Sequence, residues 1–241
     1  MTEFLVFQLR APLASWGEPA VGEYRGSREY PGESALIGLL GAALGVRRDD
    51  EPAQQRLRAG YAFAVGVHEA GTLMRDYHTA QVPSRTTLKG RPRVTRSDEL
   101  SPSRHELNTI LSTRDYRQGA ACIVAMQSMP DAVYSLAALA EALLQPRFVL
   151  YLGRKACPPA APLCPQIIAA DNALAALHSY GIELASRNGV TVRRLVRLAW
   201  SERTLAGAEP DLSAPRKDRV IRRAAWQFGD RTEHIKLLAG A

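Results

Sequence analysis

The chain has 241 residues, and its 31 Lys and Arg against 24 Asp and Glu give a formal net charge of +7. A hydrophobic content of 46% and a charged content of 23% are typical of a soluble globular protein with one large domain or two small ones. No apolar run approaches 18 residues, and Met1 leads directly into FLVFQL, so we expect neither a membrane span nor a signal peptide. Three cysteines without a C-x-x-C pair argue against a zinc site or a disulfide framework and favour the cytoplasm.

The first predicted elements are a strand, a turn-rich loop and a helix. Residues 4–9 are apolar on both faces, as in a central strand that is buried from both sides. A loop over residues 11–17 follows. Pro31 and Gly32 then break the chain, and we expect Ser34 to cap the helix that runs through LIGLLGAALG.

Glycines recur along this predicted helix at Gly38, Gly41 and Gly45, with Ala42 beside them. Their spacing places them along one face of the helix. Each interior glycine costs about 1 kcal/mol relative to alanine, so the stripe needs a compensating contact. We predict close approach of another backbone, either from the protein's own sheet or from a bound ligand.

Three further strands and a second helix follow in the sequence. Residues 61–67 alternate bulky and small side chains, residues 122–126 are apolar, and residues 148–152 read as a fourth strand. Between the last two strands we expect a helix that Asp131 caps and Pro146 ends. The order β-α-β-β-α-β predicts an α+β, ferredoxin-like (RRM-like) domain over residues 1–157.

Two segments do not fit this regular order. Residues 75–119 have few apolar side chains and several prolines, which is typical of an inserted functional arm or of a disordered connection. Residues 158–241 begin with a proline-rich joint and are predicted to form a smaller C-terminal appendage. In it we expect a short helix after Asp171, a basic strand within residues 190–200 and a loose arginine-rich tail.

The positive charge is concentrated in two parts of the chain. Residues 75–117 hold nine Lys and Arg against five acids, and residues 187–231 hold eleven against five, whereas residues 1–74 are net acidic. Segregated arginines favour a polyanionic partner, because the guanidinium fork matches phosphate oxygens. The alternative is a solvated basic face without a ligand.

Four short stretches resemble one known family. They are PLASWG at 12–17, LIGLLGAALGVRRDD at 36–50, RDYHT at 75–79 and PRFVLYLGRKACP at 146–158. Their order and spacing resemble the "Cas five" family of CRISPR-associated proteins in the RAMP superfamily, and within it the type I-E branch. The resemblance covers about residues 3–165. Glu33 departs from it, since relatives often carry a basic residue before the capping serine.

The resemblance implies a ferredoxin-like body with a thumb inserted at about residues 77–117. It implies a subunit of Cascade, a ribonucleoprotein of antiviral defence, whose glycine-rich helix and preceding loop hold the 5′ handle of the guide RNA (crRNA). Implied partners are this handle, the backbone subunit CasC and the large subunit CasA, with target DNA reached only through the assembled complex. No cofactor or metal is implied.

The candidate RNA-binding residues lie in loop 25–34, in the thumb and after the fourth predicted strand. They are Arg25, Arg28, Ser34, Tyr77, His78, Arg85, Lys89, Arg91, Arg93, Arg114, Arg154 and Lys155.

Three thumb residues also raise the alternative of a catalytic role. His78, Lys89 and Tyr77 are the residue types that a metal-independent ribonuclease uses, so processing of precursor guide RNA is the alternative function. In the branch that the chain resembles, a separate subunit cleaves, and we therefore expect a non-catalytic chain. No phosphate-binding G-x-x-x-x-G-K-[ST] loop is present, which argues against nucleotide hydrolysis. A protein-interaction module whose arginines meet partner carboxylates is the third reading.

Overall fold

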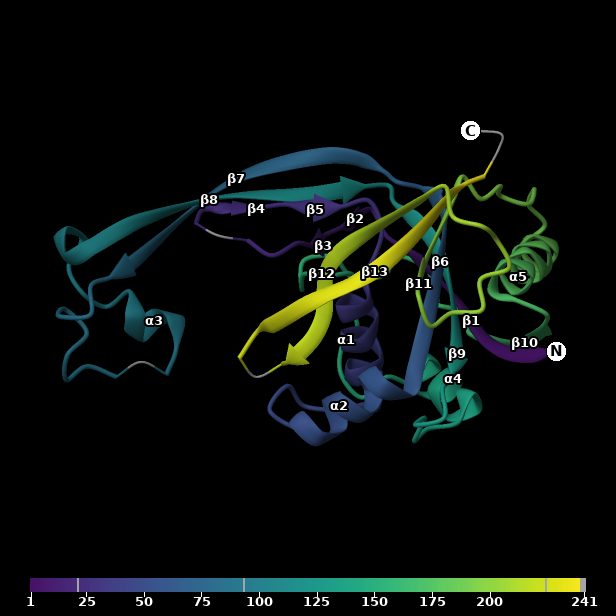
Figure 1. Cartoon of the computed structure of the whole chain (residues 1–241). Coiled ribbons are helices and arrows are strands. Elements are labelled where there is room, and N and C mark those ends of the chain that lie inside the picture. The colour runs from purple at the N-terminus through teal and green to yellow at the C-terminus, as the bar shows by residue number, and fades with distance from the viewer. Residues whose placement is uncertain (21, 93, 224, 239–241) are drawn as a thin grey trace.

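The computed structural model describes residues 1–20, 22–92, 94–223 and 225–238, and it is built on one seven-stranded sheet. The strand order is β10-β1-β9-β6-β11-β13-β12, and every neighbouring pair is antiparallel. The strands are β1 (Thr2–Arg10), β6 (Tyr61–Glu69), β9 (Ala121–Ser128), β10 (Gln166–Ala170), β11 (Arg197–Ser201), β12 (Leu212–Arg222) and β13 (Gln227–Leu237). The chain is thus a mixed α/β protein with antiparallel sheets (Figure 1).

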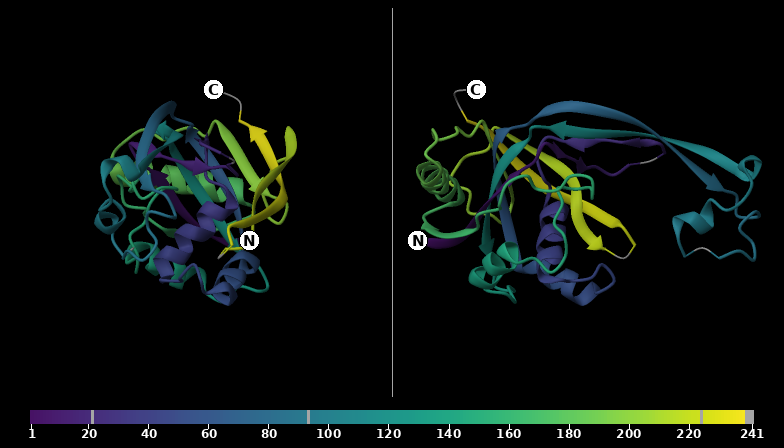
Figure 2. Two further views of the ribbon diagram at one scale, coloured as in Figure 1. Left: turned by 90° about the vertical axis from the view of Figure 1, so that its left-hand side faces the viewer. Right: turned by 180° about the vertical axis from the view of Figure 1, so that it is seen from behind.

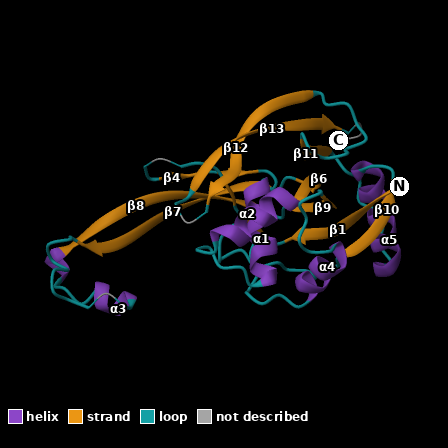
Figure 3. Ribbon diagram, turned by 60° about the horizontal axis from the view of Figure 1, so that its bottom comes forward, coloured by secondary structure: helices purple, strands orange, loops and turns teal. Residues whose placement is uncertain are grey.

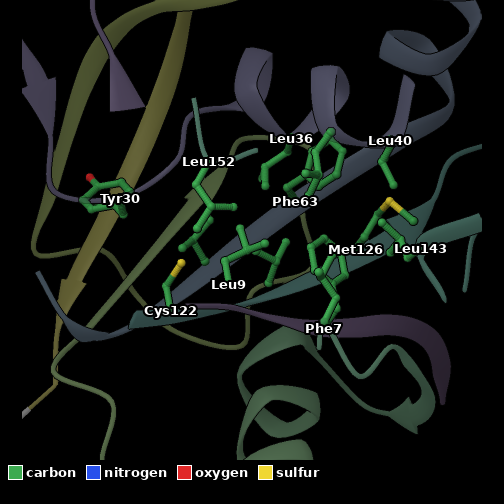
Figure 4. Close-up of a cluster of buried hydrophobic side chains, with 14 of the residues drawn as sticks. Phe7, Leu9, Tyr30, Leu36, Leu40, Phe63, Cys122, Met126, Leu143 and Leu152 are labelled. Atoms are coloured by element: carbon green, nitrogen blue, oxygen red, sulfur yellow. The ribbon is translucent and has the colours of Figure 1, made fainter. Parts of the chain in front are cut away.

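Helices cover both faces of the sheet (Figures 1 and 3). One face packs against α1 (Glu33–Leu44), α2 (Glu51–Gly60) and α4 (Leu136–Leu144), and the other packs against α5 (Ala173–Asn188). Successive residues of a strand point to opposite faces. In β1, Phe7 therefore joins the core beneath α1, whereas Val6 joins the core beneath α5. Figure 4 shows Phe7 and Met126 beneath Leu40.

The predicted strands over residues 4–9, 61–67 and 122–126 are confirmed as β1, β6 and β9. The strand predicted over residues 148–152 is wrong. That segment is a loop in which the backbone N–H of Phe148 donates to Ala42 O at the end of α1, and Ser15 N donates to Leu152 O. The backbone at both ends of this segment thus bonds to α1 and to loops instead of to a neighbouring strand. The strand that follows α4 in the sheet is β10, which pairs with β1.

Both predicted helix caps are wrong. Gly32 occupies the cap position of α1, and Glu33 N donates to Asp218 Oδ2 at 2.9 Å, so the cap comes from β12. The second helix, α4, begins at Leu136, where Ser135 Oγ accepts from Ala138 N, and it ends before Pro146 as predicted. Asp218, which caps α1, lies far from this helix in the sequence, so a local sequence pattern does not indicate the cap.

The predicted arm is a long β-hairpin that projects from the body (Figures 1 and 2). Its strands are β7 (Thr72–Pro83) and β8 (Leu107–Gln118), and its tip carries α3 (Arg96–Glu99) and the 3-10 turn η1 (Arg104–Glu106). At the body, β8 also pairs with β2 (Leu13–Ala14) and β4 (Tyr24–Arg25). Nearby, β3 (Trp16–Gly17) pairs with β5 (Ser27–Arg28). The two long strands were not predicted from the sequence.

The C-terminal third departs most from its prediction. The helix after Asp171 is confirmed as α5, and the basic strand is β11, which begins at Arg197. The prediction of a loose arginine-rich tail is wrong. Strands β12 and β13 form a hairpin that joins the main sheet, where β11 connects it to β6. The division of the chain near residue 157 stays a prediction. No helix of the described residues is long and apolar enough to cross a membrane.

Candidate nucleic-acid interface

The glycines of α1 do not meet another backbone of the protein, which corrects that part of the prediction from their spacing; close approach of a bound ligand stays a prediction. A Cβ atom on Gly38 would lie 3.0 Å from Arg223 Nη2, and one on Gly41 would lie 3.6 Å from Gln54 Nε2. Gly45 ends the helix with φ at 78°. Each glycine therefore has its own role, and only Gly38 opens the surface to an arginine of the C-terminal hairpin.

A groove with a volume of about 730 Å³ runs over the uncovered side of α1. Ser34, Gly38 and Ala42 form part of its lining, which also includes loop residues 15–20, residues 151 and 153–154, and the β12–β13 hairpin. Its basic side chains come from five separate places in the sequence: Arg25, Arg48, Arg154, Lys217 and Arg223.

The carboxylates that line this groove are already paired. Glu18 accepts from Arg28 at 2.6 Å, and Asp218 accepts from Arg231 at 2.6 Å. Their charge is compensated by arginines that do not line the groove. The groove therefore presents an excess of positive charge to a ligand.

A buried ionic cluster fixes the start of α1 to the C-terminal hairpin. Arg216 contacts Glu233 at 2.7 Å and Asp218 at 3.0 Å, and Arg231 Nη2 contacts Glu233 at 3.0 Å. Glu33 lies 3.8 Å from Arg231. These five side chains, three acids and two arginines, are called the ionic cluster below.

Burial and pairing act differently on the acids of the ionic cluster. Burial raises the pKa of Glu33, because its contact with Arg231 is long. Burial also acts to raise the pKa of Glu233, but Arg216 and Arg231 outweigh it and hold that pKa below its ordinary value. Gly32 leaves the space that the cluster needs, since a Cβ there would lie 2.1 Å from Asp218 Oδ2.

A second cluster joins the thumb to the body. Arg75 Nε donates to Asp115 Oδ1 at 2.9 Å, and Tyr24 Oη donates to Asp115 Oδ2 at 2.5 Å. The hydrogen bond from Arg75 holds the pKa of the buried Asp115 below its ordinary value. Arg154 lies over the Tyr116 ring at 4.7 Å and donates to Arg25 O at 3.3 Å. The rim of the groove is thus continuous with the base of the thumb.

The predicted RNA-binding residues fall into two sets. Arg25, Ser34 and Arg154 line the groove, and Lys155 lines an adjoining cleft, whereas Arg28 is paired with Glu18. The others lie on the thumb: Tyr77, His78 and Arg114 on the paired strands and Arg85, Lys89 and Arg91 at the tip. Arg93 lies outside the described residues.

Two members of the catalytic alternative, Tyr77 and His78, do not face each other on the thumb. Tyr77 and His78 are consecutive residues of β7, so their side chains point to opposite faces of the ribbon. His78 Nδ1 lies 3.9 Å from Asp76. Across the parts of the chain that the structure describes, no group of three or more His, Cys, Asp or Glu could hold a metal ion.

Sequence reasoning missed three basic residues of the groove, Arg48, Lys217 and Arg223, and the exposed Trp226 beside them. Arg48 lies over the ring of Trp226 at 4.3 Å, and Arg223 lies over it at 5.2 Å. Trp226 is 55% exposed. The only sequence signals were the consecutive Arg47 and Arg48 after the glycine-rich helix and the basic C-terminal segment. Neither signal indicates that these two parts of the chain meet.

Comparisons with known proteins agree with this architecture. A family model described as CRISPR-associated protein (Cas_Cas5) matches residues 4–233. The chain is 32% identical over 228 residues to the CRISPR system Cascade subunit CasD of Escherichia coli (strain K12), covering 90% of this chain and 92% of that protein.

Two solved structures are similar over nearly the whole chain. A chain of a CRISPR RNA-guided surveillance complex has a TM-score of 0.64 at 25% identity, covering 97% of this chain and 89% of its own. A structure described as a Cas protein has a TM-score of 0.60 at 23% identity, covering 98% and 94%, and shows the fold alone. The length of the family match and the identity to a curated relative establish the family, and the chain belongs to the Cas_Cas5 family of CRISPR-associated proteins.

Proposed function

We propose that the chain is a Cascade subunit that holds the 5′ handle of the guide RNA in the groove over α1 and catalyses no reaction. The observation that carries this proposal is the convergence of five basic side chains on one groove whose acids are already paired. A positively charged groove with an exposed aromatic ring is what single-stranded nucleic acid requires. The relative in Escherichia coli is a Cascade subunit, which supports the same role.

The thumb is proposed to contact the neighbouring backbone subunit, CasC, and the guide RNA. Its outer ribbon exposes Tyr77 and Ile110, which are 65% and 52% accessible, next to a basic tip. Apolar and basic side chains together suit a surface shared between protein and RNA. We propose CasA as the second protein neighbour, with target DNA reached only through the assembled complex.

We further propose that the body is a ferredoxin-like domain that β11, β12 and β13 extend. The order β10-β1-β9-β6 and the placement of α1 and α4 on one face support this assignment. The described cysteines Cys122, Cys157 and Cys164 are free, which fits the proposed location in the reducing cytoplasm.

The test uses the full chain and RNA of guide length, without divalent metal. We expect the chain, alone or assembled with its partner subunits, to bind handle-bearing RNA more tightly than a scrambled RNA of the same length, and to leave it intact. Site-specific cleavage that disappears in His78→Ala would contradict the non-catalytic role and favour the endoribonuclease. Equal binding of the two RNAs would contradict handle recognition.

A further inference from the structure

Arg48 and Arg223 form a compact cluster with Trp226 in the lining of the groove. We call the two arginines the arginine pair. Arg48 follows α1, and Arg223 and Trp226 lie at the tip of the β12–β13 hairpin. Both guanidinium groups lie within cation–π distance of the indole, at 4.3 Å and 5.2 Å from its centroid. The indole therefore holds two like charges close together on separate elements.

No carboxylate balances the arginine pair. Within the described residues neither guanidinium forms a salt bridge, whereas the adjacent Arg47 is paired with Asp49 at 3.1 Å. Burial and the charge of Arg48 both lower the pKa of Arg223. Arg223 is half-buried beside the exposed Arg48, and an anion bound between the two guanidinium groups relieves the repulsion between them.

Backbone shape leaves room for this site. Gly38 lies beneath Arg223, and a Cβ atom there would come within 3.0 Å of Arg223 Nη2. The glycine lets the guanidinium lie against the helix surface. Together with Trp226, Gly38 fixes the position of a guanidinium group that forms no salt bridge with an acid in the described parts of the chain.

The arginine pair also borders a second cleft, with a volume of about 930 Å³. Gly38, Ala42, Arg48, Tyr151 and Arg223 line both this cleft and the groove, so the two spaces adjoin. The second cleft is further lined by Phe148, which is 48% exposed, and Val149, which is 83% exposed. A phosphate site beside an aromatic-lined cleft is the combination that binds one nucleotide of an unpaired strand.

We propose that Arg48 and Arg223 bind one phosphodiester of the RNA strand and that an adjacent base leaves the stack to contact Phe148 in the second cleft. This inference rests on the proposed function, since it concerns the path of the RNA that the groove holds. It assigns a backbone contact to the arginine pair and a base contact to the cleft, which different measurements distinguish.

The phosphate contact is tested by the salt dependence of RNA binding. For single strands, log K falls with log[salt] at a slope of about −0.7 per neutralised phosphate. Arg48→Gln and Arg223→Gln should each reduce this slope by about 0.7 and weaken binding roughly tenfold at low salt. The double variant should reduce the slope no further, because both side chains share one phosphate. Arg222→Gln is the matched control, since Arg222 is exposed and lines neither space.

The base contact is tested by Phe148→Ala. Loss of one base–aromatic stack costs about 1–3 kcal/mol, so affinity should fall roughly tenfold while the salt slope stays unchanged. Leu144→Ala serves as the control, because Leu144 is 62% exposed and lies outside both spaces. In the described residues, the guanidinium groups of Arg48 and Arg223 form no hydrogen bond. The thermal midpoints of Arg48→Gln and Arg223→Gln should therefore match that of the wild type and show that these variants fold.

Binding is measured with the full chain and with the chain assembled with its partner subunits. If Arg48→Gln and Arg223→Gln behave like Arg222→Gln in both settings, the phosphate site is wrong while handle binding stands. If Phe148→Ala matches Leu144→Ala, the base contact is wrong. If the wild-type chain binds handle RNA in neither setting, the proposed function itself fails.

Discussion

At the scale of single residues, the ionic cluster holds one acid more than its arginines need. Arg231 already contacts Asp218 at 2.6 Å and Glu233 at 3.0 Å, and Glu33 is a third, more distant carboxylate at 3.8 Å. Glu33 is only 6% exposed, so it loses most of its hydration without gaining a close partner. We infer that its ionised form reduces the stability of the folded chain.

Replacing Glu33 by Gln should therefore stabilise the protein at pH 7. A gain of about 1 kcal/mol corresponds to a rise in the thermal midpoint of roughly 2–4 °C for a chain of this size. Because the pKa of Glu33 is raised in the folded state, the folded chain binds this proton more tightly than the unfolded chain. The advantage of Glu33→Gln should then vanish below the ordinary pKa of 4.5 and grow as the pH rises above it.

Thermal melts of both proteins between pH 4 and pH 8 check this prediction. Glu141→Gln is the control, since Glu141 is exposed on α4 and forms no salt bridge among the described residues. A variant that is less stable than the wild type at pH 7 would show that the attraction to Arg231 outweighs the cost of burial.

At the scale of elements, the thumb depends on the body more than the body depends on the thumb. The ribbon is fastened at its inner end, where β8 pairs with β4 at Thr113 and Arg114 and Asp115 is buried. Beyond these residues β7 and β8 pair only with each other, and both faces remain largely accessible. An isolated two-stranded hairpin is marginally stable, so the outer ribbon adds little to the stability of the body.

We predict that the outer thumb can be removed without unfolding the chain. Residues 81–109 would be replaced by Asn-Gly, a two-residue hairpin turn that connects the paired Ala80 and Ile110. The thermal midpoint should change by no more than a few degrees, because the core strands keep both faces covered. Assembly should fail, with guide RNA and the backbone subunit lost together.

Thermal melts and co-purification with the coexpressed partner subunits measure both effects. A control hairpin of the original length, with Arg85, Lys89 and Arg91 changed to Gln, separates loss of charge from loss of the arm. A large drop in midpoint with assembly intact would instead place the arm in the core.

At the scale of the whole molecule, the two sequence halves share one sheet and two cores. Strand β11 from the C-terminal part pairs with β6, and its Leu198 and Ala199 enter different cores. Helix α5 covers the face that Phe4 and Val6 present, and its Leu177 and Tyr180 are fully buried. The ionic cluster adds a polar connection between α1 and the same C-terminal part.

We therefore predict that residues 1–157 do not fold alone. Removing the rest would expose the apolar face beneath α5 and would leave β1 and β6 as unpaired edges, which favours aggregation. The full chain should unfold in one cooperative transition, and the fragment should show none. Circular dichroism melts of both check this, and a cooperative transition in the fragment would support an independent domain that ends near residue 157.

The sequence by itself determined the elements whose signals are local. Strands β1, β6 and β9 are apolar runs that helices bury on both faces, and α1 follows a clear break at Pro31 and Gly32. The absence of a core between residues 75 and 119 also marked the thumb, and three predicted residues, Arg25, Ser34 and Arg154, line the groove. These signals depend on neighbouring residues, which periodicity and composition report directly.

Only the tertiary structure decided which distant segments meet. Residues 148–152 have the composition of a strand, but Phe148 N bonds to a carbonyl at the end of α1, Leu152 bonds to loop residues, and β10 occupies the sheet edge instead. Asp218 caps a helix that begins at Glu33, and Trp226 meets Arg48 in the lining of the groove. Such pairs arise from long-range packing and charge compensation, which a local pattern does not encode, so the central part of the candidate site was visible only after folding.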